Sequence, residues 1–543
     1  MKRILLLLVV ALVATSVNCS AQSRKKNDAL CAMVSELIFD DRIEEAADVV
    51  DSVLNIYPMH SDMLHFKAIF NFAKEEDEAA FECYAKALDN IGRKSHISRS
   101  KMLYYRSMMY EDLGDYSAVI EDCTQAIASL KRSDDETLLP HILTARAEAY
   151  YCVGEYDKSE SDLMQIICLF SGANYSVDYA ISCLCEVYLI KGDYDSVIEY
   201  SKVLLTRDPE LRGEAYASLI MAYRALGDTH KMVDYVIDMA LDKEADASPT
   251  TVRGILFEDI DYARKAISER ITADTDEGNL PGYILLCDYA MDYALAHDLL
   301  KRIAEYLEPD NALYHLSDYA SRAGMYEESV EYMTQLLEIC GDDEVAYYKT
   351  LRANAYRLMG EYDKAIADVQ CYISEMEGDA SGYYYAGWCY ELKGDDATAM
   401  EYYNKAIEMD DAFPYAYLMR GEQYLKAGDS ESAMRDFEHI LEIDDQPVDD
   451  SVRHYALHFL GNDKEAAEWM ELVIASNAYR AGVLYDAACL YARMGDVNQS
   501  LDYLQLALSF GYRAKAHIEN DDDIDPIRGT EAYKALMEQY FNQ

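Results

Sequence analysis

Residues 382–411 read GYYYAGWCYELKGDDATAMEYYNKAIEMDD, and residues 416–445 read AYLMRGEQYLKAGDSESAMRDFEHILEIDD. The second segment repeats the pattern of the first at a fixed offset of 34 residues. The matched pairs are Gly387 with Gly421, Tyr390 with Tyr424, Gly394 with Gly428, Asp395 with Asp429, Ala399 with Ala433, and Tyr403 with Phe437. A fixed offset of this kind indicates an internal repeat. The stretch from Ser381 to Glu442 therefore belongs to a repeat array.

The spacing inside each copy predicts a pair of helices. Residues three and four apart share one face of a helix, so Gly387 and Tyr390 lie together on the first helix, and Ala399 and Tyr403 on the second. Gly394 falls between them, where a residue with positive φ can end the first helix. The small residues let the two helices approach to about 8–10 Å, and the aromatic ring fills the remaining gap. One such hairpin cannot bury its own apolar face, so it requires neighbours.

This pattern resembles the tetratricopeptide repeat family. That family has a small residue, an aromatic three positions later, an alanine, an aromatic four positions after it, and a proline near the end of the unit. The resemblance covers nearly all of the chain after residue 26. It implies an all-α fold, an α-solenoid of helical hairpins that forms a right-handed superhelix and ends in a C-terminal capping helix.

The residue between the two helices marks the other units of the array. Equivalent positions are Asp41, Glu75, Gly114, Gly154, Gly192, Gly227, Gly324, Gly360, Gly394, Gly428, Gly461 and Gly495. Successive positions are 33 to 40 residues apart, except for one interval of 97 residues. That interval fits three periods of about 32 residues, so two degenerate units are expected inside it. The array is therefore expected to contain about 14 hairpins.

Composition divides the array further. Residues 242–251 and 272–282 are rich in small, acidic, Pro and Gly residues, which favours hinges or boundaries there. We expect an N-terminal solenoid over residues 28–241, degenerate helical repeats over 242–308, a C-terminal solenoid over 309–509, and an acidic loop with a capping helix over 510–543. The cap would cover the apolar face that the last hairpin leaves open.

The N-terminus has the features of a secretory signal peptide. Two basic residues precede an apolar run from Ile4 to Ala14, and small and polar residues follow. Cleavage after Ala21 predicts an exported protein, either periplasmic or associated with the outer membrane. The alternative is a lipoprotein anchored at Cys19, although Asn18 differs from the small residue that usually precedes such a cysteine. The apolar run is too short for a transmembrane segment, and no later run approaches the needed length.

Strong acidity limits the classes of partner. One hundred Asp and Glu against 49 Lys and Arg give a formal net charge of −51 at pH 7. Nucleic acid binding requires clustered Lys and Arg that neutralise phosphates, so nucleic acid is excluded, and an anionic membrane surface is disfavoured. The negative charge can also be explained as a solvated acidic exterior, because a net charge far from zero keeps a protein soluble.

Motifs that indicate an enzyme or a cofactor are missing from the sequence. It has no Gly-rich phosphate loop, GxSxG elbow, HExxH helix or paired CxxC zinc ligands. Asp521, Asp523 and Asp525 alternate like the start of a calcium loop, but a proline follows where that loop needs glycine. His454 and His458 are four residues apart without a third ligand, so core packing is the better interpretation. Most of the 13 cysteines are expected to be free and buried. We predict a non-enzymatic protein with no cofactor.

The family resemblance also implies a concave groove, lined by the first helix of each hairpin. Residues one position after the packed small residue would point into it, followed on the same face by residues one turn away. The resulting set is Glu148, Glu186, Asp318, Asn354, Trp388, Glu422, Tyr314, Tyr384, Tyr485 and Arg357. Carboxylates among aromatic rings suit a basic or amphipathic partner, because the charges steer it and the rings supply rigid contact area. Solvated surface positions of an acidic protein remain an equal interpretation of these residues.

Two functions remain open from the sequence. The first is a scaffold of the cell envelope that binds a partner protein or peptide in the acidic, aromatic groove. The second is an outer-membrane lipoprotein that captures glycans or peptides, as proteins similar to SusD do on a helical-repeat frame. The chain contains only 2 Trp, which is few for stacking sugars and favours the scaffold.

Overall fold

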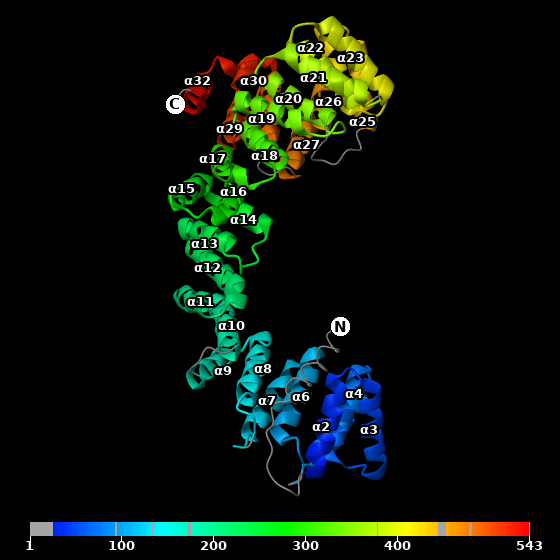
Figure 1. Ribbon diagram of the computed structural model, residues 1–543, viewed down its shortest axis with the longest axis vertical. Coiled ribbons are helices and arrows are strands. Elements are labelled where there is room, and N and C mark those ends of the chain that lie inside the picture. The colour runs from blue at the N-terminus through cyan, green and yellow to red at the C-terminus, as the bar shows by residue number, and fades with distance from the viewer. Residues whose placement is uncertain are drawn as a thin grey trace. The chain divides into compact units, whose positions relative to one another are not determined.

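The computed structural model describes residues 25–92, 95–132, 134–170, 175–376, 378–443, 452–476 and 480–541 (Figure 1). Every regular element in these ranges is a helix, which confirms the all-α prediction. The chain divides into two compact units, one ending at Ala247 and the other beginning at Ser248. The predicted signal peptide, residues 1–21, and the possible lipid anchor Cys19 lie outside the described residues. None of the helices within these ranges is long and apolar enough to cross a membrane.

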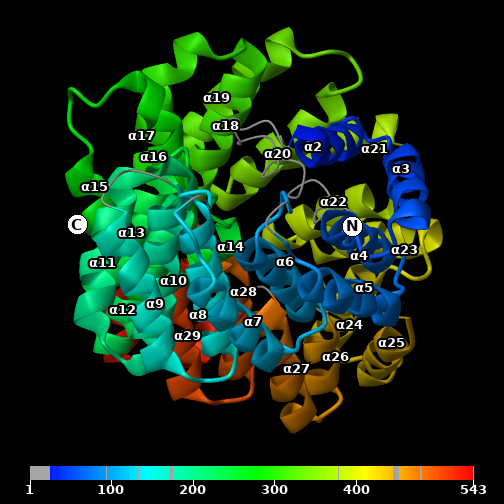
Figure 2. The same ribbon diagram turned by 90° about the horizontal axis from the view of Figure 1, so that it is seen from below.

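The first unit is a stack of helical hairpins (Figure 2). Its helices pair in chain order as α2 (Lys25–Phe39) with α3 (Ile43–Ile56), α4 (Ser61–Ala73) with α5 (Asp77–Asp89), α6 (Arg99–Asp112) with α7 (Tyr116–Ala128), α8 (Leu138–Cys152) with α9 (Tyr156–Leu169), α10 (Tyr175–Lys191) with α11 (Tyr194–Arg207), and α12 (Arg212–Leu226) with α13 (Thr229–Leu241). First helices also pack on one another, as α6 does on α8 and α10 on α12. Each hairpin thus buries its apolar face against its neighbours.

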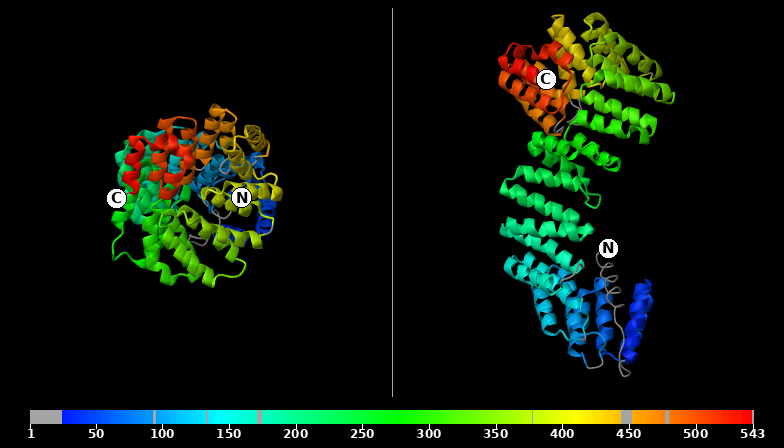
Figure 3. Two further views of the ribbon diagram at one scale, coloured as in Figure 1. Left: turned by 90° about the horizontal axis from the view of Figure 1, so that it is seen from above. Right: turned by 60° about the vertical axis from the view of Figure 1, so that its left-hand side comes forward.

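The second unit continues the pattern and ends in a cap (Figure 3). Its pairs are α14 (Pro249–Leu256) with α15 (Ile260–Arg270), α16 (Leu280–Tyr289) with α17 (Tyr293–Ile303), α18 (Pro309–Arg322) with α19 (Tyr326–Ile339), α20 (Val345–Leu358) with α21 (Tyr362–Glu375), α22 (Ala380–Leu392) with α23 (Asp396–Met409), α24 (Pro414–Lys426) with α25 (Ser430–Ile443), α26 (Arg453–Phe459) with α27 (Asp463–Ser476), and α28 (Ala481–Arg493) with α29 (Val497–Ser509). The cap consists of α30 (Lys515–Asn520), η6 (Asp522–Ile524), α31 (Asp525–Arg528) and α32 (Glu531–Phe541). The described helices make about 14 pairs, as predicted, and two short pairs, α14–α15 and α16–α17, occupy the long interval.

Positive φ marks the turn inside every described pair except α14–α15. All twelve positions picked from the sequence have φ between 60° and 87°, including the non-glycine residues Asp41 and Glu75. The structure adds Met291, with a φ of 53°, in the turn between α16 and α17, where the sequence gives no glycine to mark it. The αL conformation costs a non-glycine residue about 1–2 kcal/mol.

Glu75 offers a direct test of that cost, because its side chain is exposed. Glu75→Gly is expected to stabilise the α4–α5 hairpin by about 0.5–1 kcal/mol, since relief of the αL strain exceeds the added chain entropy of glycine. Hydrogen exchange of the α4 and α5 amides would measure the change. In the matched control Glu78→Gly, the exposed residue lies in helix α5, and a loss of about 1 kcal/mol is expected instead. Destabilisation by Glu75→Gly would contradict the strain argument.

Close packing between paired helices agrees with the roles predicted for the small residues. A Cβ added at Gly387 would lie 2.6 Å from Cε1 of Tyr403, and one added at Gly421 would lie 2.5 Å from Cε1 of Phe437. Tyr403 and Phe437 are themselves fully buried. These glycines are required by the approach of the second helix. The cysteines from Cys31 onward are all free thiols, and six of them are buried.

A recurring ion pair, not anticipated from the sequence, links the two helices of four hairpins. In each, an arginine of the first helix binds an aspartate 16 residues later through two parallel hydrogen bonds of 2.6–2.8 Å. The pairs are Arg106–Asp122, Arg146–Asp162, Arg352–Asp368 and Arg420–Asp436. The aspartate side chains are 3–9% exposed. Each arginine also lies over the tyrosine four residues later, 5.8–5.9 Å from its ring centroid.

The end of the array returns to its own beginning within the second unit. Arg264 of α15 donates to the carbonyl of Ala290 at 2.9 Å and to that of Ser509, the last residue of α29, at 2.8 Å. The rings of Phe257 and Phe510 lie 5.1 Å apart. The second unit therefore closes on itself, and the first helices of its hairpins face an enclosed space.

Candidate functional site

A cavity of about 1510 Å³ lies inside the second unit. Its walls come from α22, α24, α26 and α28, and from the cap around Asp521. Aromatic side chains line much of it, namely Tyr293, Tyr362, Tyr384, Tyr385, Trp388, Phe413, Tyr415, Tyr455 and Tyr485. The closed repeat array thus forms a deep concave site with rigid aromatic walls.

Four of the ten residues predicted to face the groove line this cavity, namely Tyr384, Trp388, Glu422 and Tyr485. The other residues predicted in the second unit, Asn354, Arg357, Tyr314 and Asp318, are not among its lining residues. Tyr314 contacts Tyr347 instead, with 3.5 Å between the hydroxyls, and Asp318 pairs with Arg322 at 3.1 Å. Glu148 and Glu186 belong to the first unit. The structure thus brings four of the ten predicted residues together in one cavity.

Arg357 packs against Trp388, which is a residue of the cavity wall. Its guanidinium lies 3.9 Å from the ring centroid of Trp388 and donates to Asn354 Oδ1 at 2.7 Å. Only 9% of the residue is exposed, and its Nε has no partner among the described residues. A cation stacked on the indole restricts the Trp388 rotamer, so the ring is presented to the cavity in a fixed orientation.

Three charged groups from distant parts of the chain meet at the cavity wall. Arg493 of α28 donates to Glu422 of α24 at 2.7 Å and also pairs with Asp523 of η6. The three side chains are about one-fifth exposed. Burial, together with the charge of Asp523, raises the pKa of Glu422 in spite of the nearby arginine. Arg493 therefore pairs with two carboxylates and links the cap to α24 and α28.

Asp486 presents its carboxylate to the cavity. The residue is exposed, yet protein surrounds it on the cavity walls. This enclosure and the charges of Asp521 and Asp523 raise the pKa of Asp486 to about 7. No hydrogen bond or ion pair reaches its side chain from any residue in the described ranges. The sequence pattern indicates its neighbour Tyr485 but not Asp486. The environment of Asp486 arises only because the cap packs against α28.

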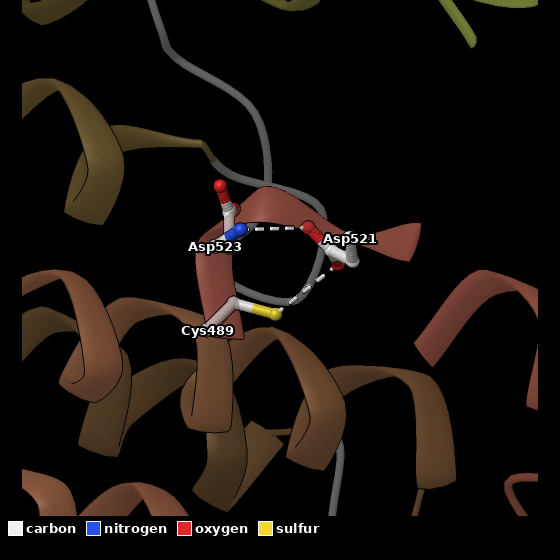
Figure 4. A group of neighbouring side chains, drawn as sticks. All are labelled: Cys489, Asp521 and Asp523. Atoms are coloured by element: carbon white, nitrogen blue, oxygen red, sulfur yellow. Dashed lines mark hydrogen bonds between the residues drawn. The ribbon is translucent and has the colours of Figure 1, made fainter. Parts of the chain in front are cut away.

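Cys489, Asp521 and Asp523 gather where the cap meets α28 (Figure 4). Their ligand atoms lie within 4.8 Å of one another, the spacing of a metal site. However, each of them is used within the protein. Asp521 accepts a hydrogen bond from the Tyr485 hydroxyl at 2.8 Å and one from the Asp523 amide at 3.0 Å. Burial and the two aspartates raise the pKa of Cys489, so the thiol stays protonated and donates to Asp521 at 3.6 Å. The group is better explained as the joint between the cap and α28.

The paired histidines have separate environments. His454 is 4% exposed and lines the cavity, and burial lowers its pKa to about 3. Neither of its ring nitrogens has a partner among the described residues. His458 instead binds Asp463 at 2.7 Å. His454 is therefore a neutral ring with one N–H and one unprotonated nitrogen, both buried and without a partner among the described residues.

The first unit carries carboxylates on consecutive first helices. Burial, followed by the charge of Glu148, raises the pKa of Glu111 to about 7. Burial also raises the pKa of Glu148, which accepts a hydrogen bond from Tyr179 at 2.8 Å, and that of Glu186, which lies near Glu214. These residues form an acidic stripe.

The model of the tetratricopeptide repeat family matches residues 310–343, 380–413 and 414–447. These three segments are tetratricopeptide repeats. No curated protein matches it in sequence. Among similar solved structures, one of MamA is 22% identical and covers 32% of this chain and 95% of its own, with a TM-score of 0.26. A chain of the APC/C hetero-tetramer Cut9-Hcn1 is 13% identical over 98% of this chain and 99% of its own, with a TM-score of 0.29. A chain of the Naa15/Naa10 structure bound to HypK-THB is 12% identical and covers 95% of this chain and 96% of its own, with a TM-score of 0.28.

The matched tetratricopeptide repeats build part of the cavity. Residues 380–413 contribute Tyr384 and Trp388, and residues 414–447 contribute Glu422. Tetratricopeptide repeats support a role as a protein–protein interaction scaffold. The concave side of these repeats is therefore the candidate site.

Proposed function

We propose that this tetratricopeptide-repeat protein is a non-enzymatic scaffold of the cell envelope that holds a basic or amphipathic segment of a partner protein in the cavity of its second unit. The observation that carries this proposal is the cavity, which combines nine aromatic side chains with carboxylates on one concave surface. Its location rests on the signal-peptide pattern in residues 1–21.

The size and lining of the cavity favour a polypeptide segment over a small metabolite. Sites for small molecules usually measure about 300–1,000 Å³ and are mostly apolar, whereas this cavity is larger and mixes charged groups with the rings. Rigid aromatic side chains anchor protein partners efficiently, because they bury a large area at little cost in conformational entropy. A segment of several residues can contact both kinds of group at once.

Site-specific photocrosslinking in intact cells would identify the partner. A photoreactive residue at Tyr385 faces the cavity, and one at Met409, which is 44% exposed on α23, provides the matched control. The proposal requires a partner segment that crosslinks at Tyr385 and not at Met409. The crosslinked segment is then synthesised as a peptide and used as the ligand in a binding titration.

The two tryptophans allow that measurement to locate the peptide. Trp388 lines the cavity and Trp469 is not among its lining residues, so a Trp469→Phe variant carries its only indole at the site. Titration with the peptide is expected to shift the emission of Trp388 to shorter wavelength, because the bound segment excludes water from the ring. The Trp388→Phe variant, which keeps only Trp469, should show no such shift. Binding that leaves the Trp388 emission unchanged would place the partner elsewhere and overturn the proposal.

A further inference from the structure

Four carboxylates from α24, α28 and the cap line one part of the cavity, namely Glu422, Asp486, Asp521 and Asp523. Arg493 pairs with Glu422 and Asp523. Asp521 is held by Tyr485 and by the backbone of the cap. Asp486 is thus the member of this group whose carboxylate has no partner in the described part of the chain.

Aromatic side chains line the same cavity as that carboxylate. The Tyr455 hydroxyl donates to the main-chain carbonyl of Asp486 at 3.2 Å, which fixes the backbone that carries it. Burial, followed by the charge of Asp486, raises the pKa of Tyr455, whose ring lines the same cavity as Asp486. The charge of Asp486 also acts on Tyr384 of α22. A planar cation that enters here would meet ring faces as well as a carboxylate.

His454 gives an independent indication of what the cavity lacks. It lies next to Tyr455 in α26, it lines the same cavity, and its neutral ring keeps an acceptor nitrogen without a donor. Leaving such a polar atom buried and unpaired costs about 1–3 kcal/mol. A positively charged group with N–H donors would suit both the acceptor nitrogen of His454 and the Asp486 carboxylate.

We infer that the cavity receives the side chain of an arginine on the bound segment, with its guanidinium against Asp486 and its plane among the surrounding tyrosine rings. Arginine fits because its planar, delocalised cation stacks on aromatic faces and binds a carboxylate through two parallel hydrogen bonds. A lysine ammonium is more strongly hydrated and cannot stack in this way. This inference rests on the proposed function, because it names the group by which the partner segment is recognised.

The probe for this inference is N-acetyl-arginine amide, titrated into the full-length Trp469→Phe protein. A ligand of this size is expected to half-saturate the Trp388 signal at low-millimolar concentration. N-acetyl-citrulline amide has nearly the same shape without the charge, so it serves as the neutral control, with sodium chloride added to equalise ionic strength. Asp486→Asn is expected to weaken arginine-amide binding at least 30-fold, and Asp486→Glu to restore part of it. Thermal unfolding followed by circular dichroism verifies that each variant is folded.

Two results would overturn the inference. One is equal binding of the arginine and citrulline amides, and the other is arginine binding that Asp486→Asn leaves unchanged in a folded protein. The two proposals fail separately. If a partner peptide shifts the Trp388 emission but its arginine residues can be replaced by citrulline without loss of affinity, the scaffold function stands and the arginine site falls. If arginine amide binds through Asp486 but no protein crosslinks at Tyr385, the site stands and the scaffold function falls.

Discussion

Asp436→Ala is expected to destabilise the α24–α25 hairpin by about 3–5 kcal/mol, because it removes one partner of a buried ion pair and leaves the other charged. Asp436 is 8% exposed and accepts two hydrogen bonds from Arg420, at 2.8 and 2.7 Å. Arg420 also donates to Asn404 on the preceding hairpin, so its loss of alignment weakens the stack between repeats. In a solenoid this damage remains near the mutated unit. Hydrogen exchange of the amides in α24 and α25 would measure it.

Two controls separate the ion pair from the helix that carries it. Glu438→Ala removes an exposed carboxylate two residues away on α25 and should change stability by less than about 0.5 kcal/mol. The double variant Arg420→Met, Asp436→Leu replaces both charges with apolar groups and should recover most of the stability. If the α25 amides of the Asp436→Ala variant exchange as slowly as those of the wild type, the ion pair does not stabilise the hairpin.

The hairpins were predictable because their cause is local. Helix periodicity, the small packed residues and the positive-φ turn all lie within one 34-residue unit, so Gly387, Gly394 and Tyr403 could be assigned from their spacing alone. Met291 could not, since a methionine gives no sign that its backbone adopts φ of 53°. The Arg–Asp link was also within reach. Its two residues precede the small residue of the first helix and the packed residue of the second, always 16 positions apart.

The cavity depended on contacts that no local pattern contains. Arg264 and Ser509 are separated by 245 residues, and their hydrogen bond helps bring the cap against the first helices of the second unit. This return places Asp521 and Asp523 near Asp486. Four of the predicted groove residues, Tyr384, Trp388, Glu422 and Tyr485, line the resulting cavity. Residues on one face of one helix can be predicted from sequence, whereas the curvature that closes an array depends on small rotations summed over many repeats.

Acidification from pH 8 to pH 5.5 is expected to weaken arginine-amide binding about 30-fold, because only ionised Asp486 attracts the guanidinium and its pKa is about 7. The groups that act on this carboxylate are Arg480, which lowers its pKa, and Asp521 and Asp523, which raise it, with Tyr384, Tyr455, Cys489, Tyr512 and Arg493 nearby. The Asp486→Asn variant should bind weakly at every pH between these limits. Titrations at several pH values, with constant ionic strength, would measure both curves.

Stability should respond to pH in the opposite direction. A carboxyl whose pKa is raised in the folded state binds its proton more tightly there than in the unfolded chain, so its contribution to stability is present at low pH and is lost as pH rises through about 7. Asp486 and Glu422 both have raised pKa values, and the unfolding midpoint of the second unit should therefore fall between pH 5.5 and 8 by more in the wild type than in Asp486→Asn. A binding site for a cation explains why the chain keeps a carboxylate that lowers its stability at neutral pH. The ionised carboxylate costs stability while the site is empty, and a bound guanidinium offsets that cost. Equal pH dependence of unfolding in the two proteins would mean that Asp486 is ionised without penalty, and the case for a missing cation would lose its physical basis.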